Sequence, residues 1–175
     1  MRRSMLFIPG NTPNLLINGN CLGADAVIFD LEDAVSPAEK DSARILVRNT
    51  MKYLNFRGCE IIVRINSIDT EYWKHDLDEV MTQKPNLIML PKTSCAQDVL
   101  TAGEYIGQVE QRLGYEKNTV RLMPLIETAL GVENAYAIAS ASDRVAALFL
   151  GAEDLTADLR CKRTKGGAEI AYARS

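Results

Sequence analysis

The sequence predicts an α/β fold built on a parallel sheet, because strand-like and helix-like patterns alternate along its 175 residues. Each strand-like segment is a short, nearly continuous apolar run, which is typical of a strand buried on both faces. Six β-then-α units in succession indicate parallel strands joined by helical crossovers. The expected strands span residues 5–9, 26–30, 60–65, 86–90, 120–126 and 145–150.

The helices between these strands are expected from capping residues and apolar spacing. Pro13 and Pro37 suit the first turns of two helices, since proline lacks the N–H that a first turn leaves unpaired. Ser94 can cap a third helix, and the alanine-rich stretch before Ser140 favours another. The expected helices span about residues 13–22, 37–54, 70–81, 95–109 and 129–140, with loop and helix from about residue 155.

Two architectures contain such units: a (β/α)8 TIM barrel and an open doubly wound sheet. An open sheet that binds nucleotides usually carries a G-x-G-x-x-G or P-loop motif after a strand, and this sequence has neither. Polar residues recur at the expected strand ends, and in a barrel all strand ends face one mouth. We therefore predict a single barrel domain over residues 1–175. Since a full barrel needs about 250 residues, we expect it to be truncated after about six β/α units.

Composition narrows the classes of function. The chain is 47% hydrophobic and 25% charged, and its net charge of −3 gives no reason to expect a nucleic acid or an anionic membrane as partner. No apolar run reaches the roughly 18 residues of a transmembrane helix. The four cysteines are scattered without C-x-x-C spacing, which is typical of reduced thiols. We therefore expect a cytoplasmic protein without structural zinc.

Two carboxylates mark a candidate metal site. Glu127 and Asp154 each follow an apolar run, and they lie 27 positions apart, the length of one β/α unit. The carboxyl ends of neighbouring parallel strands lie close together, so two acids there repel each other unless a cation lies between them. Mg²⁺ prefers oxygen ligands and needs one or two protein carboxylates. The alternative is that both acids only cap the helices that follow.

Other charged residues are expected at the same mouth. The Arg64 guanidinium can bind a carboxylate through two parallel hydrogen bonds, or it can form a structural ion pair with Glu32 or Asp33. Some acids of the Asp30–Asp33 segment can cap the next segment, and others can orient metal-bound waters. Lys92 can meet an anion or pair with an acid. The single histidine, His75, is expected on an exposed helix face without a catalytic role.

Seven further segments occur in order along the whole chain, at residues 3–10 (RSMLFIPG), 29–35 (FDLEDAV), 63–66 (VRIN), 90–92 (LPK), 126–128 (IET), 151–155 (GAEDL) and 172–175 (YARS). Together they resemble the citrate lyase β-subunit family, which belongs to the HpcH/HpaI aldolase superfamily. The resemblance implies a (β/α)8 barrel, commonly trimeric, that binds Mg²⁺ and makes or breaks a C–C bond in an acyl-thioester.

The resemblance also implies roles for individual residues. Glu127 and Asp154 are expected to bind Mg²⁺. Arg64 is expected to hold the carboxylate or carbonyl side of the substrate, and Glu32 and Asp33 to support the metal-bound waters. We accordingly predict catalytic roles for Arg64, Glu32 and Asp33, and substrate contacts for Arg64, Gly151 and Ala152.

Several reactions occur in this family. Residues 2–7 and 40–44 resemble true citrate lyase β subunits most, so cleavage of a citryl-thioester to oxaloacetate and an acetyl-thioester is the first hypothesis. The thioester would be carried by CoA or an acyl-carrier protein, with citrate lyase α and γ subunits as partners and a homotrimer as the assembly. The alternatives are a malyl-CoA or citramalyl-CoA lyase, a malate-synthase-like condensing enzyme, and a non-catalytic assembly subunit.

Overall fold

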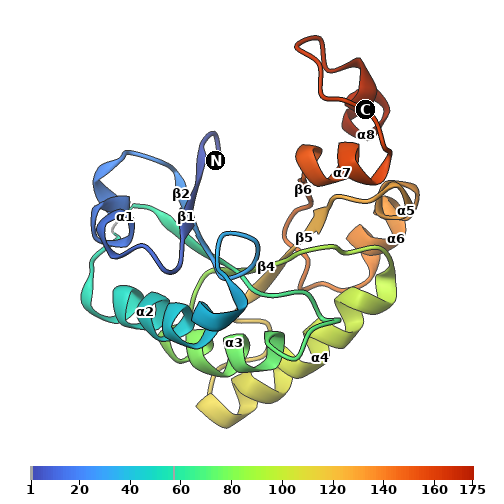
Figure 1. The fold of residues 1–175 in the computed structure, drawn as a ribbon. Helices are drawn as coiled ribbons and strands as arrows, with labels where there is room; N and C mark the ends of the chain where they lie inside the picture. The colour runs from blue at the N-terminus through green and yellow to red at the C-terminus, as the bar shows by residue number, and fades with distance from the viewer. Residues whose placement is uncertain (1, 57) are drawn as a thin grey trace.

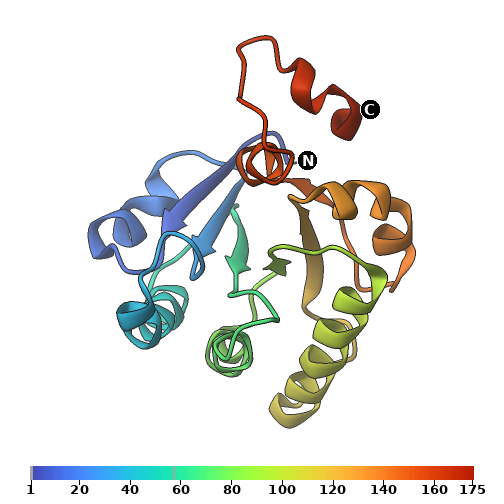
Figure 2. The ribbon, with the colours of Figure 1, turned by 45° about the vertical axis from the view of Figure 1, so that its right-hand side comes forward.

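Six parallel strands form the centre of the computed structural model, which describes residues 2–56 and 58–175. They follow one another in the sheet in chain order, so the prediction of parallel, sequentially ordered strands is confirmed. Figure 2 shows that the sheet curves into a half-barrel. The strands are β1 (Met5–Pro9), β2 (Ala26–Asp30), β3 (Glu60–Arg64), β4 (Leu87–Leu90), β5 (Arg121–Ile126) and β6 (Phe149–Leu150).

Helices cover the convex side of this curved sheet (Figure 2). These are α1 (Pro13–Asn18), α2 (Lys40–Tyr53), α3 (Trp73–Val80), α4 (Ala96–Leu113), α5 (Ala129–Glu133) and α6 (Ala135–Ser140). The other two helices are α7 (Ala152–Asp158) and α8 (Ala171–Arg174). Single 3₁₀ turns are η1 (Gly19–Cys21), η2 (Pro37–Glu39), η3 (Met81–Gln83) and η4 (Ala168–Ile170). The last segment, with α7 and α8, extends beyond the end of the sheet (Figure 1). No helix of the described residues is long and apolar enough to span a bilayer.

Alternate residues of each strand enter two separate apolar layers. Val27, Val63 and Ile88 point outward and pack with the helices in the larger cluster. Ile28 and Met89 point to the concave side and belong to a smaller cluster. Because side chains alternate along a strand, burial of both faces requires the continuous apolar runs that the sequence shows.

The first and sixth strands are the edges of the sheet, and each pairs on one side only. The ring centroids of Phe7 on β1 and Phe149 on β6 lie 5.9 Å apart in an edge-to-face arrangement. Such pairs stabilise by about 1 kcal/mol beyond the area that they bury. The two edges therefore meet through side chains across the concave side without sharing a strand ladder.

The structure corrects three local predictions. The sixth strand covers only Phe149–Leu150, and Val145 makes an isolated bridge instead of starting it. The helix expected over 129–140 divides at Asn134, whose side-chain amide donates to the Ser94 carbonyl at 2.9 Å. Ser94 is not the cap of α4. Cys95 occupies that position, and the Asp98 carboxylate accepts its backbone N–H at 3.0 Å. The break at Asn134 follows from a tertiary contact, whereas the α4 cap is a local pair between residues three apart. Separately, the four cysteines are free thiols that form no disulfide bond with one another.

A buried ion pair fixes α4 against the end of the α6–β6 connection. Glu110 and Arg144 are 1% and 3% exposed, and their side chains are joined by two hydrogen bonds of 2.9 Å. Glu110 also accepts the backbone N–H of Val120 at 2.9 Å. Burial opposes ionisation of Glu110, but these donors prevail and hold the pKa of its carboxyl below the ordinary value of 4.5.

Glu110→Gln should lower the free energy of unfolding by about 3 kcal/mol, since it leaves the Arg144 charge buried without its partner. Glu104→Gln, on the exposed side of the same helix, is the control.

A carboxyl with a lowered pKa, such as that of Glu110, stabilises the folded state above its unfolded pKa and loses this effect as pH falls. Wild type should therefore lose stability below about pH 4.5 more steeply than Glu110→Gln. Urea unfolding at several pH values tests this, and equal losses in both variants would contradict it.

Candidate functional site

Charged side chains from several strands gather at the carboxyl end of the sheet. Asp30 is the last residue of β2, Arg64 is the last residue of β3, and Glu127 directly follows β5. All three are at least nine-tenths buried. Asp154 lies in the first turn of α7, which begins shortly after β6 ends at Leu150. The predicted convergence of strand ends is therefore present, and it includes both signs of charge.

Arg64 is held by three carboxylates. Its Nε and Nη2 donate to the two oxygens of Asp30 at 2.7 and 2.5 Å, which is a bidentate pair. Its Nη1 lies 3.1 Å from Glu32 Oε2 and 3.6 Å from Asp33 Oδ2. Burial alone would lower the pKa of Arg64, but Asp30 and the other two acids raise it. The ion pairing with Glu32 and Asp33 that the sequence left open is present, and Asp30 adds the strongest contact.

The register of the sheet explains this pair. Asp30 and Arg64 are opposite each other in the β2–β3 ladder. Side chains of such cross-strand partners point to the same face and lie within contact distance. Asp30 also accepts the backbone N–H of Glu32 at 2.9 Å. On the other side, the Arg64 guanidinium lies 5.2 Å from the centre of the Phe7 ring, a cation–π distance.

Lys92 connects two of the acids. Its Nζ lies 2.7 Å from Glu32 Oε1, and this contact raises the pKa of Lys92. Its backbone N–H donates to Glu127 Oε1 at 2.7 Å. Burial nevertheless raises the pKa of Glu32, against the effect of Lys92 and Arg64. Lys92 has a φ of 52°, in the left-handed region that costs a side chain about 1 kcal/mol or more, and such positions are common at functional sites.

Glu127 and Asp154 form a carboxylate pair. Glu127 is 2% exposed, and burial is the main reason that its pKa rises to about 7. The Lys92 N–H opposes this rise, while the charges of Glu32 and Asp154 and a hydrogen bond with Asp154 add to it. The pair therefore carries excess negative charge when ionised, which a bound cation would relieve.

Gly151 allows Glu127 to reach this position. A Cβ at residue 151 would lie 2.7 Å from Glu127 Oε2 and 3.2 Å from Leu125 Cδ1, and the first distance is shorter than side chains tolerate. Ala152 starts α7 directly after it and leads to Asp154. The structure thus places Gly151 and Ala152 beside the carboxylate pair. Their predicted contacts with substrate stay predictions.

The donor set fits Mg²⁺. In the described part of the chain, no three His, Cys, Asp or Glu residues are grouped so that they could hold a metal ion by themselves. Mg²⁺ does not need such a group, because it commonly keeps several waters and uses one or two carboxylates together with substrate oxygens. Glu127 and Asp154, both oxygen donors, meet this requirement. Their roles as ligands, like the catalytic roles of Arg64, Glu32 and Asp33, stay predictions.

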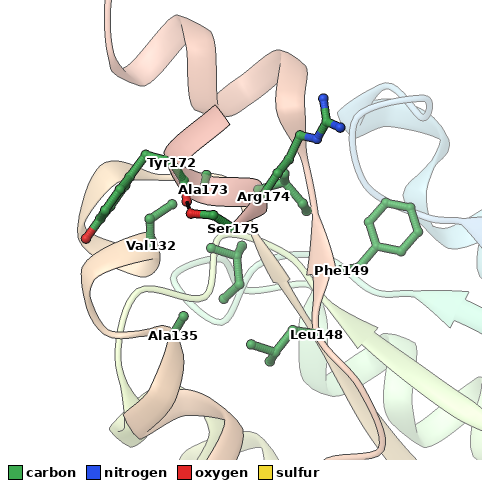
Figure 3. A pocket seen from close by; sticks show the side chains of 10 residues that line it. Val132, Ala135, Leu148, Phe149, Tyr172, Ala173, Arg174 and Ser175 are labelled. Carbon is green, nitrogen blue, oxygen red and sulfur yellow. Dashed lines mark hydrogen bonds between the residues drawn. The ribbon is translucent and has the colours of Figure 1, made fainter. Parts of the chain in front are cut away.

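A separate hollow of about 580 Å³ lies along the edge strand β6, and Figure 3 shows its lining. Leu148, Val132 and Ala135 form its apolar side, and Tyr172 and Arg174 come from α8. None of the strand-end carboxylates lines it. The hollow is therefore not part of the candidate site.

Asp30 and Lys92 make closer contacts in the site than the sequence predicts, and His75 lies outside the site as expected. Asp30 was considered only among several acids, although it makes the bidentate contact with Arg64. The available signal was its position at the end of an apolar run, as for Arg64 in the next strand. Lys92 pairs with an acid, one of the two options that the sequence left open: its Nζ contacts Glu32, and its backbone N–H contacts Glu127. His75 is exposed on α3, as expected.

The sequence matches the family model described as HpcH/HpaI aldolase/citrate lyase over residues 3–175. It is 42% identical over 175 residues to the citrate lyase subunit beta of Leuconostoc mesenteroides subsp. cremoris, covering 100% of this chain and 58% of that protein. It is 34% identical to the L-malyl-CoA/beta-methylmalyl-CoA lyase of Cereibacter sphaeroides, covering 97% of this chain and 54% of that protein. The chain thus spans little more than half the length of these relatives.

Among solved structures, the citrate lyase beta subunit from M. tuberculosis, complexed with oxaloacetate and magnesium, has the same fold. The TM-score is 0.73 and the sequences are 32% identical, over 99% of this chain and 72% of that one.

Gly151→Ala should lower the free energy of unfolding by about 1–3 kcal/mol, because the new methyl group displaces Glu127 or the α7 backbone. Gly166→Ala is the matched control, since a Cβ there meets no atom within 4 Å. Thermal or urea unfolding measures both. If the two variants were equally stable, Glu127 would not be confined as the structure shows.

Proposed function

The chain belongs to the HpcH/HpaI aldolase/citrate lyase family, and from this premise we propose that it is the catalytic part of a Mg²⁺-dependent carbon–carbon lyase. The substrate that we propose is a citryl-thioester, cleaved to oxaloacetate and an acetyl-thioester. The citrate lyase β subunits among the relatives are 39–42% identical to the chain, which supports this choice over the malyl-CoA lyases at 32–34% identity.

The Glu127–Asp154 pair is the observation that carries the proposal. It places two oxygen donors at the carboxyl end of the sheet, in the same site as the Arg64 guanidinium and the Lys92 ammonium. Bound Mg²⁺ would supply positive charge that stabilises the charge developing on substrate oxygens as the C–C bond breaks. Neither a Schiff-base lysine nor a Ser-His-Asp triad is needed for such a reaction, and the single histidine lies on the surface.

The chain's own residues orient the reactants. The Lys92 N–H donates to Glu127 Oε1 and so orients the carboxyl group. The same carboxyl is hydrogen-bonded to Asp154. Asp30 holds the Nε–Nη2 edge of Arg64, which fixes the plane of the guanidinium. The remaining N–H groups of Arg64 would bind the carboxylate or carbonyl oxygens of the keto-acid half of the substrate, in competition with the exposed Asp33. Glu32 keeps Arg64 and Lys92 together.

The complete assembly is also part of the proposal. We infer that the six strands are the first units of a (β/α)8 barrel and that residues 1–175 are one partial domain of it. The fold shared with the longer M. tuberculosis protein supports this inference. The proposed partners are citrate lyase α and γ subunits, the thioester carrier is CoA or an acyl-carrier protein, and the proposed assembly is a cytoplasmic homotrimer. A second candidate, a malyl-CoA or citramalyl-CoA lyase, is favoured by the 34% identical relative.

Calorimetric titration of the complete native chain with Mg²⁺ should detect binding that Glu127→Gln or Asp154→Asn weakens by at least about 10-fold. Each change removes a charged oxygen donor and keeps the side-chain shape. Glu133→Gln, an exposed change on the neighbouring α5, should leave affinity within about twofold. Unchanged affinity in both site variants would exclude this carboxylate pair as the Mg²⁺ site.

Arg64→Lys should lower kcat/KM by at least about 10-fold, equivalent to about 1.4 kcal/mol of transition-state stabilisation. Lysine keeps the charge but loses the planar fork that orients the keto-acid half. Mg²⁺ affinity should change little, because Arg64 is not a ligand. The assay is oxaloacetate release from a citryl-thioester, with malyl-CoA and citramalyl-CoA as parallel substrates. Wild-type turnover by Arg64→Lys would exclude Arg64 from the site, and cleavage of only malyl-CoA or citramalyl-CoA would select the second candidate.

A further inference from the structure

Lys40 is a buried cation outside the set of residues that contact the proposed substrate or metal. It is the first residue of α2 and is 7% exposed. Its Nζ donates to the main-chain oxygens of Leu31 at 2.7 Å and Glu32 at 2.6 Å. Both oxygens belong to the loop that follows β2. One side chain of α2 therefore holds the loop that carries Glu32 and Asp33.

A lysine is an unfavourable residue for this position. Burial lowers the pKa of Lys40, although the charges of Asp76, Asp30 and Glu32 oppose that effect. Its hydrogen bonds go to neutral carbonyls, and in the described residues no carboxylate forms an ion pair with it. A cation at a helix N-terminus is also repelled by the helix dipole. An apolar side chain of similar length would avoid these costs, so the two carbonyl contacts are what a lysine specifically provides.

These contacts fix the backbone from which the Glu32 carboxylate extends. The Glu32 carbonyl accepts both the Lys40 ammonium and the backbone N–H of Val35, the latter at 3.0 Å. The peptide cannot rotate without breaking both hydrogen bonds. The carboxylate of the same residue lies between Arg64 Nη1 at 3.1 Å and Lys92 Nζ at 2.7 Å. A rotation of the loop would therefore separate Glu32 from the two cations of the site.

We propose that Lys40 is a positioning residue of the lyase site: by holding the Leu31 and Glu32 carbonyls, it places the Glu32 carboxylate between Arg64 and Lys92. Lys40 acts through Glu32 and contacts no reacting group. The inference rests on the proposed lyase function for its kinetic test, and its structural test is independent of activity.

The kinetic test is a double-mutant cycle in the complete native enzyme with Mg²⁺ present, using Lys40→Met, Glu32→Gln and the double variant. Lys40→Met should lower kcat by at least about 10-fold in wild type. It should lower kcat less than about twofold when Glu32 is already Gln, because residues that act as a unit are not additive. Lys52→Met, an exposed change on the same helix, should have no effect. An equal loss in both backgrounds would show a merely structural role and overturn the proposal.

The structural test is amide hydrogen exchange. In Lys40→Met the Val35 amide should exchange at least about 10-fold faster. The amide of Ile65, which directly follows β3 and donates to the Met89 carbonyl of β4, should keep its rate. Equal acceleration of both amides would indicate general destabilisation and overturn the proposal, as would an unchanged Val35 rate. If wild type cleaves no thioester, the proposed function fails, and the Val35 rate still decides whether Lys40 holds the loop.

Discussion

The bidentate ion pair between Asp30 and Arg64 is the contact on which the strand-end site depends. Both side chains are buried, so each charge depends on the other as its partner to offset the loss of water. Asp30 also accepts the Glu32 N–H and thereby fixes the start of the acidic loop. Arg64 in turn attracts Glu32 and Asp33. Removal of either partner would leave a buried charge and release the loop that carries the remaining acids.

The charges of the site are arranged in two groups with different balance. Around Arg64 and Lys92, the two cations are engaged in close ion pairs with three acids, Asp30, Glu32 and Asp33. Around Glu127 the balance is negative, because its carboxyl accepts a neutral backbone N–H, that of Lys92, and its side-chain hydrogen-bond partner is another acid, Asp154. The lack of a cationic partner is why a cation is expected at Glu127 and Asp154. An anionic substrate group is expected at Arg64 because it would replace the exposed Asp33 beside the guanidinium.

Helices outside the sheet support this arrangement by holding the loops. Lys40 of α2 binds the carbonyls of the loop after β2. Asp76 of α3, which is fully buried, accepts the Asn66 N–H at 2.9 Å in the loop after β3 and also accepts Arg44 Nε at 3.0 Å. Buried polar contacts of this kind have defined geometry, so they orient loops in a way that apolar packing does not. The site is therefore preorganised from the convex side of the sheet.

The sequence by itself determined the parallel α/β architecture, the strand order and the set of charged residues at the strand ends. Apolar runs and helical spacing are local consequences of burial on two faces, so they can be read along the chain. The tertiary structure decided the partners. Only the β2–β3 register shows that Asp30, not Glu32 or Asp33, is the bidentate partner of Arg64. Likewise, only the fold brings the Lys92 N–H to Glu127, because residues 35 positions apart meet through strand pairing that no local pattern encodes.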